Sequence, residues 1–226
     1  MSGNAWDLLQ SFAHAFLFAA LALFPIVNPL GMAPIFLSFT AGIDDRSRCR
    51  LARLVAYNSF LLAAASLLIG SYVLRFLGLS LPAVQIGGGL LVAATGWRLL
   101  SSGDNPAERD GGSPSTESVM AGAFYPLTMP LTVGPGSIAI MITIGSNAPH
   151  AWAEPATALI DAAGGLAGVA VVSLAIYVSY RYAERILSRF GKHGVNALLR
   201  LSAFILLCLG VQILLNGYAA AKAAGF

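Results

Sequence analysis

Two short segments of this chain combine prolines, glycines and neutral polar side chains in nearly the same order. Residues 24–34 read FPIVNPLGMAP and residues 125–135 read YPLTMPLTVGP. One shift of 101 residues superimposes three prolines of the first segment on three of the second, namely Pro25, Pro29 and Pro34 on Pro126, Pro130 and Pro135. A chain with 11 prolines in 226 residues rarely gives such a match by chance, so the two motifs indicate an internal repeat.

Both motifs predict a break in a helix. Proline has no backbone N–H and its ring collides with the preceding turn, and the residue before a proline is pushed out of helical geometry. Asn28 and Met129 each precede a proline and are expected on unwound backbone. A helix that begins after such a break offers free N–H groups and a positive dipole end, which suit a carboxylate. The alternative is that the prolines only kink helices for packing.

The side chains of the motifs suit the binding of a small polar solute. Asn28, Thr128 and Thr132 supply neutral hydrogen-bond donors and acceptors, and glycines allow a ligand to approach the backbone closely. The predicted solute-binding residues are Asn28, Pro29, Gly31, Thr128, Pro130, Thr132, Gly134 and Gly136.

The elements that carry these motifs are predicted to be transmembrane helices. The chain is 57% hydrophobic and only 10% charged, with a mean hydropathy of +0.76, whereas soluble domains carry about 25% charged residues. A crossing needs roughly 20 apolar residues, and strands with open edges cannot be satisfied in lipid. We expect an all-α membrane protein with six spans, the first and fourth broken at the proline motifs, at about 8–39, 51–74, 83–100, 119–144, 156–180 and 195–218.

The spans divide into two units of three helices. We expect a first repeat over residues 1–100, a linker on the cytoplasmic side rich in Gly, Ser and Pro over 101–118, and a second repeat over 119–226. An odd number of spans in each unit forces the two units into opposite orientations, which is a common plan among secondary transporters.

The distribution of basic residues predicts the orientation of the chain. Lys and Arg gather in cytoplasmic loops. The side predicted to be cytoplasmic carries Arg46, Arg48, Arg50, Arg53, Arg98, Arg109, Arg181, Arg185, Arg189, Lys192 and Arg200, and the other side Arg75 and Lys222. Both termini are therefore expected outside the cytoplasmic (inner) membrane.

Two further polar residues within spans are candidates for coupling or proton relay. Asp161 is the acidic residue that lies well into a span, and such carboxylates are functional candidates. Asn58 lies at a comparable depth in the second span. The alternative for Asp161 is a position at the membrane interface, because it lies only one to two turns from the end of its span.

The motifs resemble those of the MarC family of bacterial and archaeal membrane proteins, also called the small neutral amino acid transporter (NAAT) family. The resemblance rests on Asn28-Pro29-Leu30-Gly31 with Pro34-Ile35-Phe36-Leu37, and on Pro130-Leu131-Thr132 with Gly134-Pro135-Gly136. It implies six spans and, from some members, transport of small neutral amino acids such as glycine and alanine. Many members carry an acidic residue where this chain has Asn28, which leaves coupling through that position open.

The leading hypothesis is a secondary transporter of small neutral amino acids or similar small polar solutes by alternating access. Its partners would be the solute, the lipid bilayer and a coupling ion (H+ or Na+), with no cofactor, metal or nucleic acid. The alternatives are a passive channel and a stress-response membrane protein without transport. A membrane-embedded enzyme is disfavoured, because the spans offer no paired carboxylates, His cluster or Ser-His pairing. Solute identity, direction of transport and oligomeric state stay open.

Overall fold

The computed structural model describes residues 5–40, 42–101, 116–146, 155–187, 191–223 and 225. These residues form helices joined by short turns and contain no strand, which confirms the predicted all-α class. The elements are α1 (Ala5–Val27), α2 (Pro29–Phe39), α3 (Asp45–Phe76), α4 (Leu81–Ser101), α5 (Thr116–Ala121), the wide irregular helix η1 (Ala123–Thr132), α6 (Pro135–Ser146), α7 (Pro155–Arg181), α8 (Ala183–Leu187) and α9 (Gly191–Ala223).

Five of the described helices are long and apolar enough to cross a membrane. They are Trp6–Val27, Asp45–Phe76, Leu81–Ser101, Thr157–Arg181 and Asn196–Ala223. The pair η1 and α6, bent by 69° at the break between them, makes a sixth crossing if it is counted as one span. The chain is therefore a multi-pass helical membrane protein, with five or six candidate spans among the described residues.

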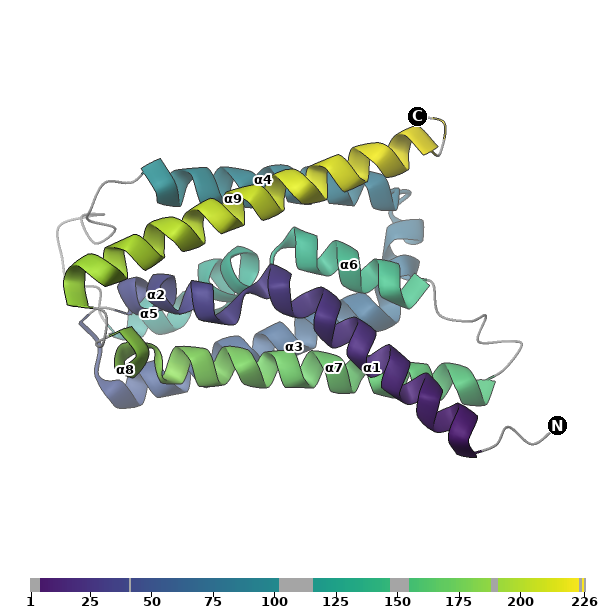
Figure 1. Cartoon of the computed structure of the whole chain (residues 1–226), viewed down its shortest axis with the longest axis horizontal. Helices are drawn as coiled ribbons and strands as arrows, with labels where there is room; N and C mark the ends of the chain where they lie inside the picture. Colours follow the sequence, from purple (N-terminus) through teal and green to yellow (C-terminus); the bar gives the residue numbers. More distant parts are fainter. Residues whose placement is uncertain are drawn as a thin grey trace.

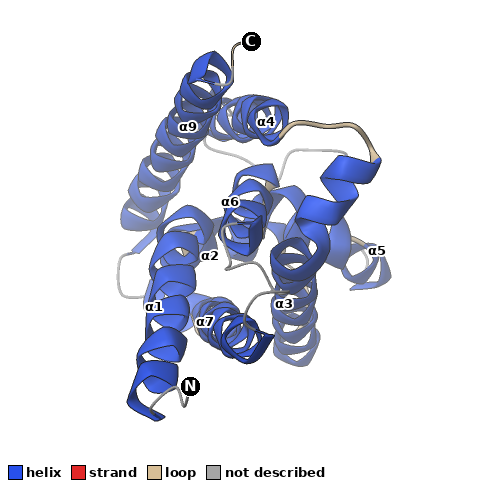
Figure 2. Ribbon diagram, turned by 90° about the vertical axis from the view of Figure 1, so that its right-hand side faces the viewer, coloured by secondary structure: helices blue, strands red, loops and turns tan. Residues whose placement is uncertain are grey.

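The helices form three layers. In Figure 1, α4 and α9 run side by side along the top and α3 and α7 lie along the bottom. Between them lie α2, η1 and α6, and α1 descends from this middle layer across α7 (Figures 1 and 2). These interrupted segments contact both outer layers. The broken helices that carry the two motifs therefore occupy the middle of the bundle.

Glycines allow the helix backbones of the outer layers to touch. A Cβ atom at Gly89 of α4 would lie 2.6 Å from the backbone nitrogen of Leu214 in α9, and one at Gly96 would lie 2.5 Å from that of Leu207. Helices in lipid associate chiefly through such close packing of small residues. The contact explains why α4 and α9 stay together along most of their length.

Both ends of the chain lie at the same end of the bundle (Figure 1). The opposite end, here called the arginine-bearing end, holds the start of α3, the end of α4, α8 and the start of α9. The described basic residues of the predicted cytoplasmic set belong to these helix ends and to the end of α7, whereas Arg75 and Lys222 lie near the ends of α3 and α9 that point the other way. Arg109 and Arg189 lie outside the described residues, as does most of the predicted linker.

Candidate functional site

The first break consists of a single residue, Asn28, between α1 and α2. Its backbone is left-handed, with φ 42° and ψ 61°, a conformation that non-glycine residues seldom adopt and that asparagine tolerates best. The Asn28 Oδ1 accepts a hydrogen bond from the Gly31 backbone nitrogen at 3.2 Å, which caps the start of α2. Pro29 occupies the first turn of α2, where its missing N–H costs nothing. The predicted unwound backbone at Asn28 is confirmed.

The other two prolines of this motif do not break a helix. Pro25 lies inside α1 and Pro34 inside α2, so the expectation that the residue before each proline leaves helical geometry is wrong for Phe24 and Ala33. A proline removes one backbone hydrogen bond, and membrane helices tolerate this loss when neighbouring groups satisfy the freed carbonyl. The turn after Pro25 stays closed, because the Asn28 nitrogen donates to the Phe24 carbonyl at 2.9 Å.

The second break is longer and includes all of η1. Tyr125 (φ −122°, ψ 122°) and Met129 (φ −116°, ψ 122°) are extended, and each precedes a proline, as the steric effect of proline on its predecessor requires. The prediction for Met129 is confirmed. The two motifs therefore match in sequence but interrupt their helices over different lengths.

The Thr128 and Thr132 hydroxyls donate hydrogen bonds to backbone carbonyls of η1. The Thr128 Oγ1 donates to the Ala123 carbonyl at 2.7 Å, and the Thr132 Oγ1 donates to the Leu127 carbonyl at 2.6 Å. Both threonines are buried. A hydroxyl has one proton and two lone pairs, so in this conformation each threonine can offer a ligand only an acceptor.

Tyr180 of α7 joins α2, which follows the first break, to η1, which forms the second break. Its phenol oxygen lies 2.8 Å from the Thr132 Oγ1, and because the Thr132 proton is already donated to Leu127, Tyr180 is the donor. The Tyr180 ring stacks on Phe36 of α2, with centroids 4.4 Å apart and planes 15° apart. Tyr180 was not among the residues predicted from the sequence, although a buried tyrosine in an apolar helix needs a hydrogen-bond partner.

The glycines of the second motif face neighbouring helices. A Cβ atom at Gly136 would overlap with Ile213 of α9, and one at Gly134 would lie 3.0 Å from the Pro130 carbonyl and 3.4 Å from Val92 of α4. Both glycines are buried. In this conformation they allow close helix packing, while Gly31 gives room to the Asn28 side chain.

Asp161 and Asn58 lie on α7 and α3. The Ser11 hydroxyl of α1 donates to the Asp161 Oδ1 of α7 at 2.7 Å, and both residues are half-buried. Asn58 is half-buried on α3, and no hydrogen bond joins it to Asp161 in the part of the chain that the structure describes. The structure thus supplies a partner for Asp161 that the sequence did not indicate.

Three buried side-chain polar atoms lack a hydrogen-bond partner among the described residues. They are the Arg48 Nε and the Ser59 Oγ of α3 and the Gln85 Oε1 of α4. Ser59 is 1% exposed and belongs to the buried stripe of α3, a helix that packs against η1, α6 and α7. Unsatisfied buried groups are rare in proteins and are costly unless a ligand or water satisfies them.

Comparison with known proteins identifies the family. The model of the MarC family of integral membrane proteins matches residues 13–221. The chain belongs to the MarC family. Among its relatives is the inner membrane protein MarC of Citrobacter koseri, 32% identical over 200 residues, which cover 86% of this chain and 90% of the relative.

Other MarC proteins show the same degree of similarity. The inner membrane proteins MarC of Salmonella paratyphi B and of Escherichia coli O139:H28 are each 30% identical over 200 residues, again covering 86% of this chain and 90% of the relative. No solved structure matches the chain. The resemblance drawn from the two proline motifs is confirmed, and the relatives' names agree with a location in the inner membrane.

Proposed function

We propose that this MarC family protein is a secondary transporter of small neutral amino acids, or of similar small polar solutes, across the cytoplasmic membrane by alternating access. The observation that carries the proposal is the presence of two helix breaks in contacting segments of the middle layer, α2 and η1. Irregular backbone at membrane depth is tolerated where protein buries it or where it lines a water-filled cavity. Discontinuous helices that meet at the bilayer midplane form the binding sites of many secondary transporters.

The side chains at the breaks are suited to a zwitterion. The predicted solute-binding set contains no charged residue, so a solute with no net charge brings no unpaired charge into the membrane. The α2 and α6 N-termini and the Asn28 Nδ2 would donate to the carboxylate. The Thr128 and Thr132 oxygens, which can only accept, would face the ammonium group.

The helix contacts support two inverted copies of a three-helix unit. In that arrangement α1 with α2 corresponds to η1 with α6, α3 to α7, and α4 to α9. The contact of α1 with α7 then corresponds to the contact of η1 with α3. The contact of α2 with α7 corresponds to that of α6 with α3, and the contact of α2 with α9 corresponds to that of α6 with α4. Each of these contacts is present. Two such units can rock against each other around a shared site.

The distribution of basic residues supports an orientation with the arginine-bearing end in the cytoplasm and both termini outside. Asp161, which accepts a hydrogen bond from Ser11, is the candidate for coupling to H+ or Na+. No catalytic role is proposed for the chain.

Flux measurements test the function. Purified protein in liposomes should take up labelled glycine or alanine with saturable kinetics and should exchange it with unlabelled solute trapped inside. A passive channel would conduct without saturation or counterflow. Flux no greater than that of protein-free liposomes, for these and related solutes, would refute the transport proposal.

A further inference from the structure

Side chains from the two halves of the chain meet between the breaks and the arginine-bearing end. Phe36 lies near the end of α2, about two turns beyond Asn28, and Tyr180 lies in the last turn of α7. Their rings stack, and Tyr180 donates to Thr132. One tyrosine from the second half therefore closes the space between α2 of the first half and η1.

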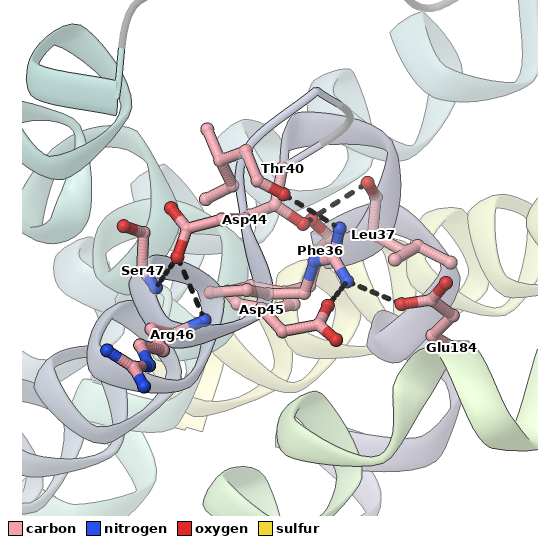
Figure 3. Close-up of polar contacts among 10 residues, drawn as sticks. Phe36, Leu37, Thr40, Asp44, Asp45, Arg46, Ser47 and Glu184 are labelled. Atoms are coloured by element: carbon pink, nitrogen blue, oxygen red, sulfur yellow. Dashed lines mark hydrogen bonds and ion pairs between the residues drawn. The ribbon is translucent and has the colours of Figure 1, made fainter.

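A second contact between the halves lies nearer the end of the bundle. The Arg48 Nη1 of α3 lies 2.5 Å from the Glu184 Oε2 of α8 and 3.0 Å from the Asp45 Oδ1, and its Nη2 donates to the Ile43 carbonyl at 3.2 Å. Figure 3 shows Glu184 reaching this guanidinium from α8. The Arg48 side chain is only 13% exposed, so the ion pair fastens the start of α3 to the short helix that follows α7.

Local hydrogen bonds fix the segments that carry these contacts. The Thr40 hydroxyl donates to the Phe36 carbonyl at 2.9 Å and closes the end of α2, and the Asp44 carboxylate accepts from the Arg46 and Ser47 nitrogens and caps α3 (Figure 3). Phe36 and Arg48 are thus held at ordered helix ends, and neither contact depends on a loose loop.

We propose that these two contacts form a gate at the arginine-bearing end, closed in this structure, which separates when the solute site opens to that side. The inner layer is Phe36, Tyr180 and Thr132, and the outer layer is the ion pair of Arg48 with Glu184. Rocking of one half against the other must separate Phe36 from Tyr180 and Arg48 from Glu184, because each of these pairs joins residues of opposite halves. The bond of Tyr180 to Thr132 lies within the second half and positions the Tyr180 ring against Phe36. The outer layer is easily broken, since the Glu184 side chain is 61% exposed and solvent screens the pair. The gate rests on the proposed transport function.

A cysteine reporter tests the gate without any solute. The full chain, with Cys49→Ser, Cys208→Ala and Val133→Cys, would be placed in lipid nanodiscs and treated with a membrane-impermeant maleimide. Val133 is 1% exposed and directly follows Thr132, so it should react slowly while the gate is closed. Tyr180→Phe and Glu184→Gln should each raise the labelling rate several-fold, and Tyr180→Ala should raise it further.

Matched variants control for the chemical changes. Tyr177→Phe removes a hydroxyl from the same helix, at a tyrosine that accepts from Arg181 and is not bonded to Thr132. Arg50→Gln removes an exposed charge from α3. Both should label at the reporter's original rate. If size-exclusion chromatography and circular dichroism show that the Tyr180→Ala protein is not folded, the test relies on Tyr180→Phe and Glu184→Gln.

The outcomes separate the gate from the transport function. Unchanged labelling in folded Tyr180→Phe and Glu184→Gln proteins would overturn the gate, even if liposomes containing the protein transport solute. Faster labelling in these variants, together with an absence of flux, would keep the gate and overturn transport of the solutes tested.

Discussion

The side-chain amide of Asn28 occupies the space that a side chain at position 31 would need. A Cβ atom on Gly31 would overlap with the Asn28 amide, whose Oδ1 accepts from the Gly31 nitrogen at 3.2 Å. The two residues thus form one unit: the asparagine caps α2 because the glycine leaves room for it. This relationship gives the Asn-Pro-Leu-Gly sequence a physical meaning and leads to the first two predictions.

Gly31→Ala should displace the Asn28 amide and remove the cap of α2. Loss of such a cap costs about 1 kcal/mol, so the unfolding temperature in detergent should fall, and solute affinity should fall with it. Gly87→Ala is the control, because a Cβ atom there meets nothing within 4 Å. A Gly31→Ala protein as stable as the Gly87→Ala protein would contradict the capping unit.

Asn28→Gly tests the role of the Asn28 side-chain amide separately from that of the left-handed backbone at the break. Glycine adopts φ 42° without strain and replaces a capping residue at a cost of only a few tenths of a kcal/mol. The free energy of unfolding should therefore change little. If the amide binds the solute, the solute concentration for half-maximal uptake should rise about 10-fold, because a lost hydrogen bond of about 1.4 kcal/mol weakens binding by that factor. Unchanged uptake would remove Asn28 from the solute site and leave it a structural role.

Thr132 and Tyr180 should be energetically coupled. Thr132→Val keeps the volume but leaves the Leu127 carbonyl and the Tyr180 hydroxyl without their partner, at about 1–3 kcal/mol for each buried unsatisfied group. Adding Tyr180→Phe removes one of these groups, so the double variant should be less destabilised than the sum of the single variants. Chemical unfolding of the four proteins measures the coupling, and simple additivity would argue against the hydrogen bond. Thr132→Ser should remain close to the original stability.

Ser59→Ala should lower the affinity for the solute without lowering the stability of the protein. The Ser59 Oγ is buried without a partner among the described residues, so its removal should leave the free energy of unfolding unchanged or raise it by up to ~1 kcal/mol. If the solute satisfies this hydroxyl, its affinity should fall about 5-fold. Ser66→Ala is the matched control on α3, because the Ser66 hydroxyl donates to the Leu62 carbonyl of its own helix at 2.7 Å. Equal effects of the two variants on affinity would exclude Ser59 from the site.

The parts of the fold that depend on local composition could be predicted from the sequence. Four spans follow from uninterrupted apolar runs, at Asp45–Phe76, Leu81–Ser101, Thr157–Arg181 and Asn196–Ala223. The extended backbone at Met129 follows from the steric effect of Pro130. The steric rule for the residue before a proline does not hold at Phe24 and Ala33, because Pro25 and Pro34 lie within α1 and α2.

The contacts of the candidate site could not be predicted in the same way. Thr132 and Tyr180 are 48 residues apart in the chain, and nothing in the sequence near either residue indicates the other. The Thr128 and Thr132 hydroxyl protons are donated to carbonyls of η1, and η1 packs against α3 and α2. Long-range packing thus decides which groups stay free for a ligand.

The position of the chain ends has a practical consequence. Residues at the beginning of α1 and the end of α9 lie at the same end of the bundle, so the order of the two halves along the chain is not imposed by the helix packing. In a circularly permuted chain, a flexible linker would join the original ends and the new ends would lie between α4 and α5. Every helix of this chain would cross the membrane in its present direction. Tags on the original ends would also report from the same side of the membrane, and tags on the new ends from the other.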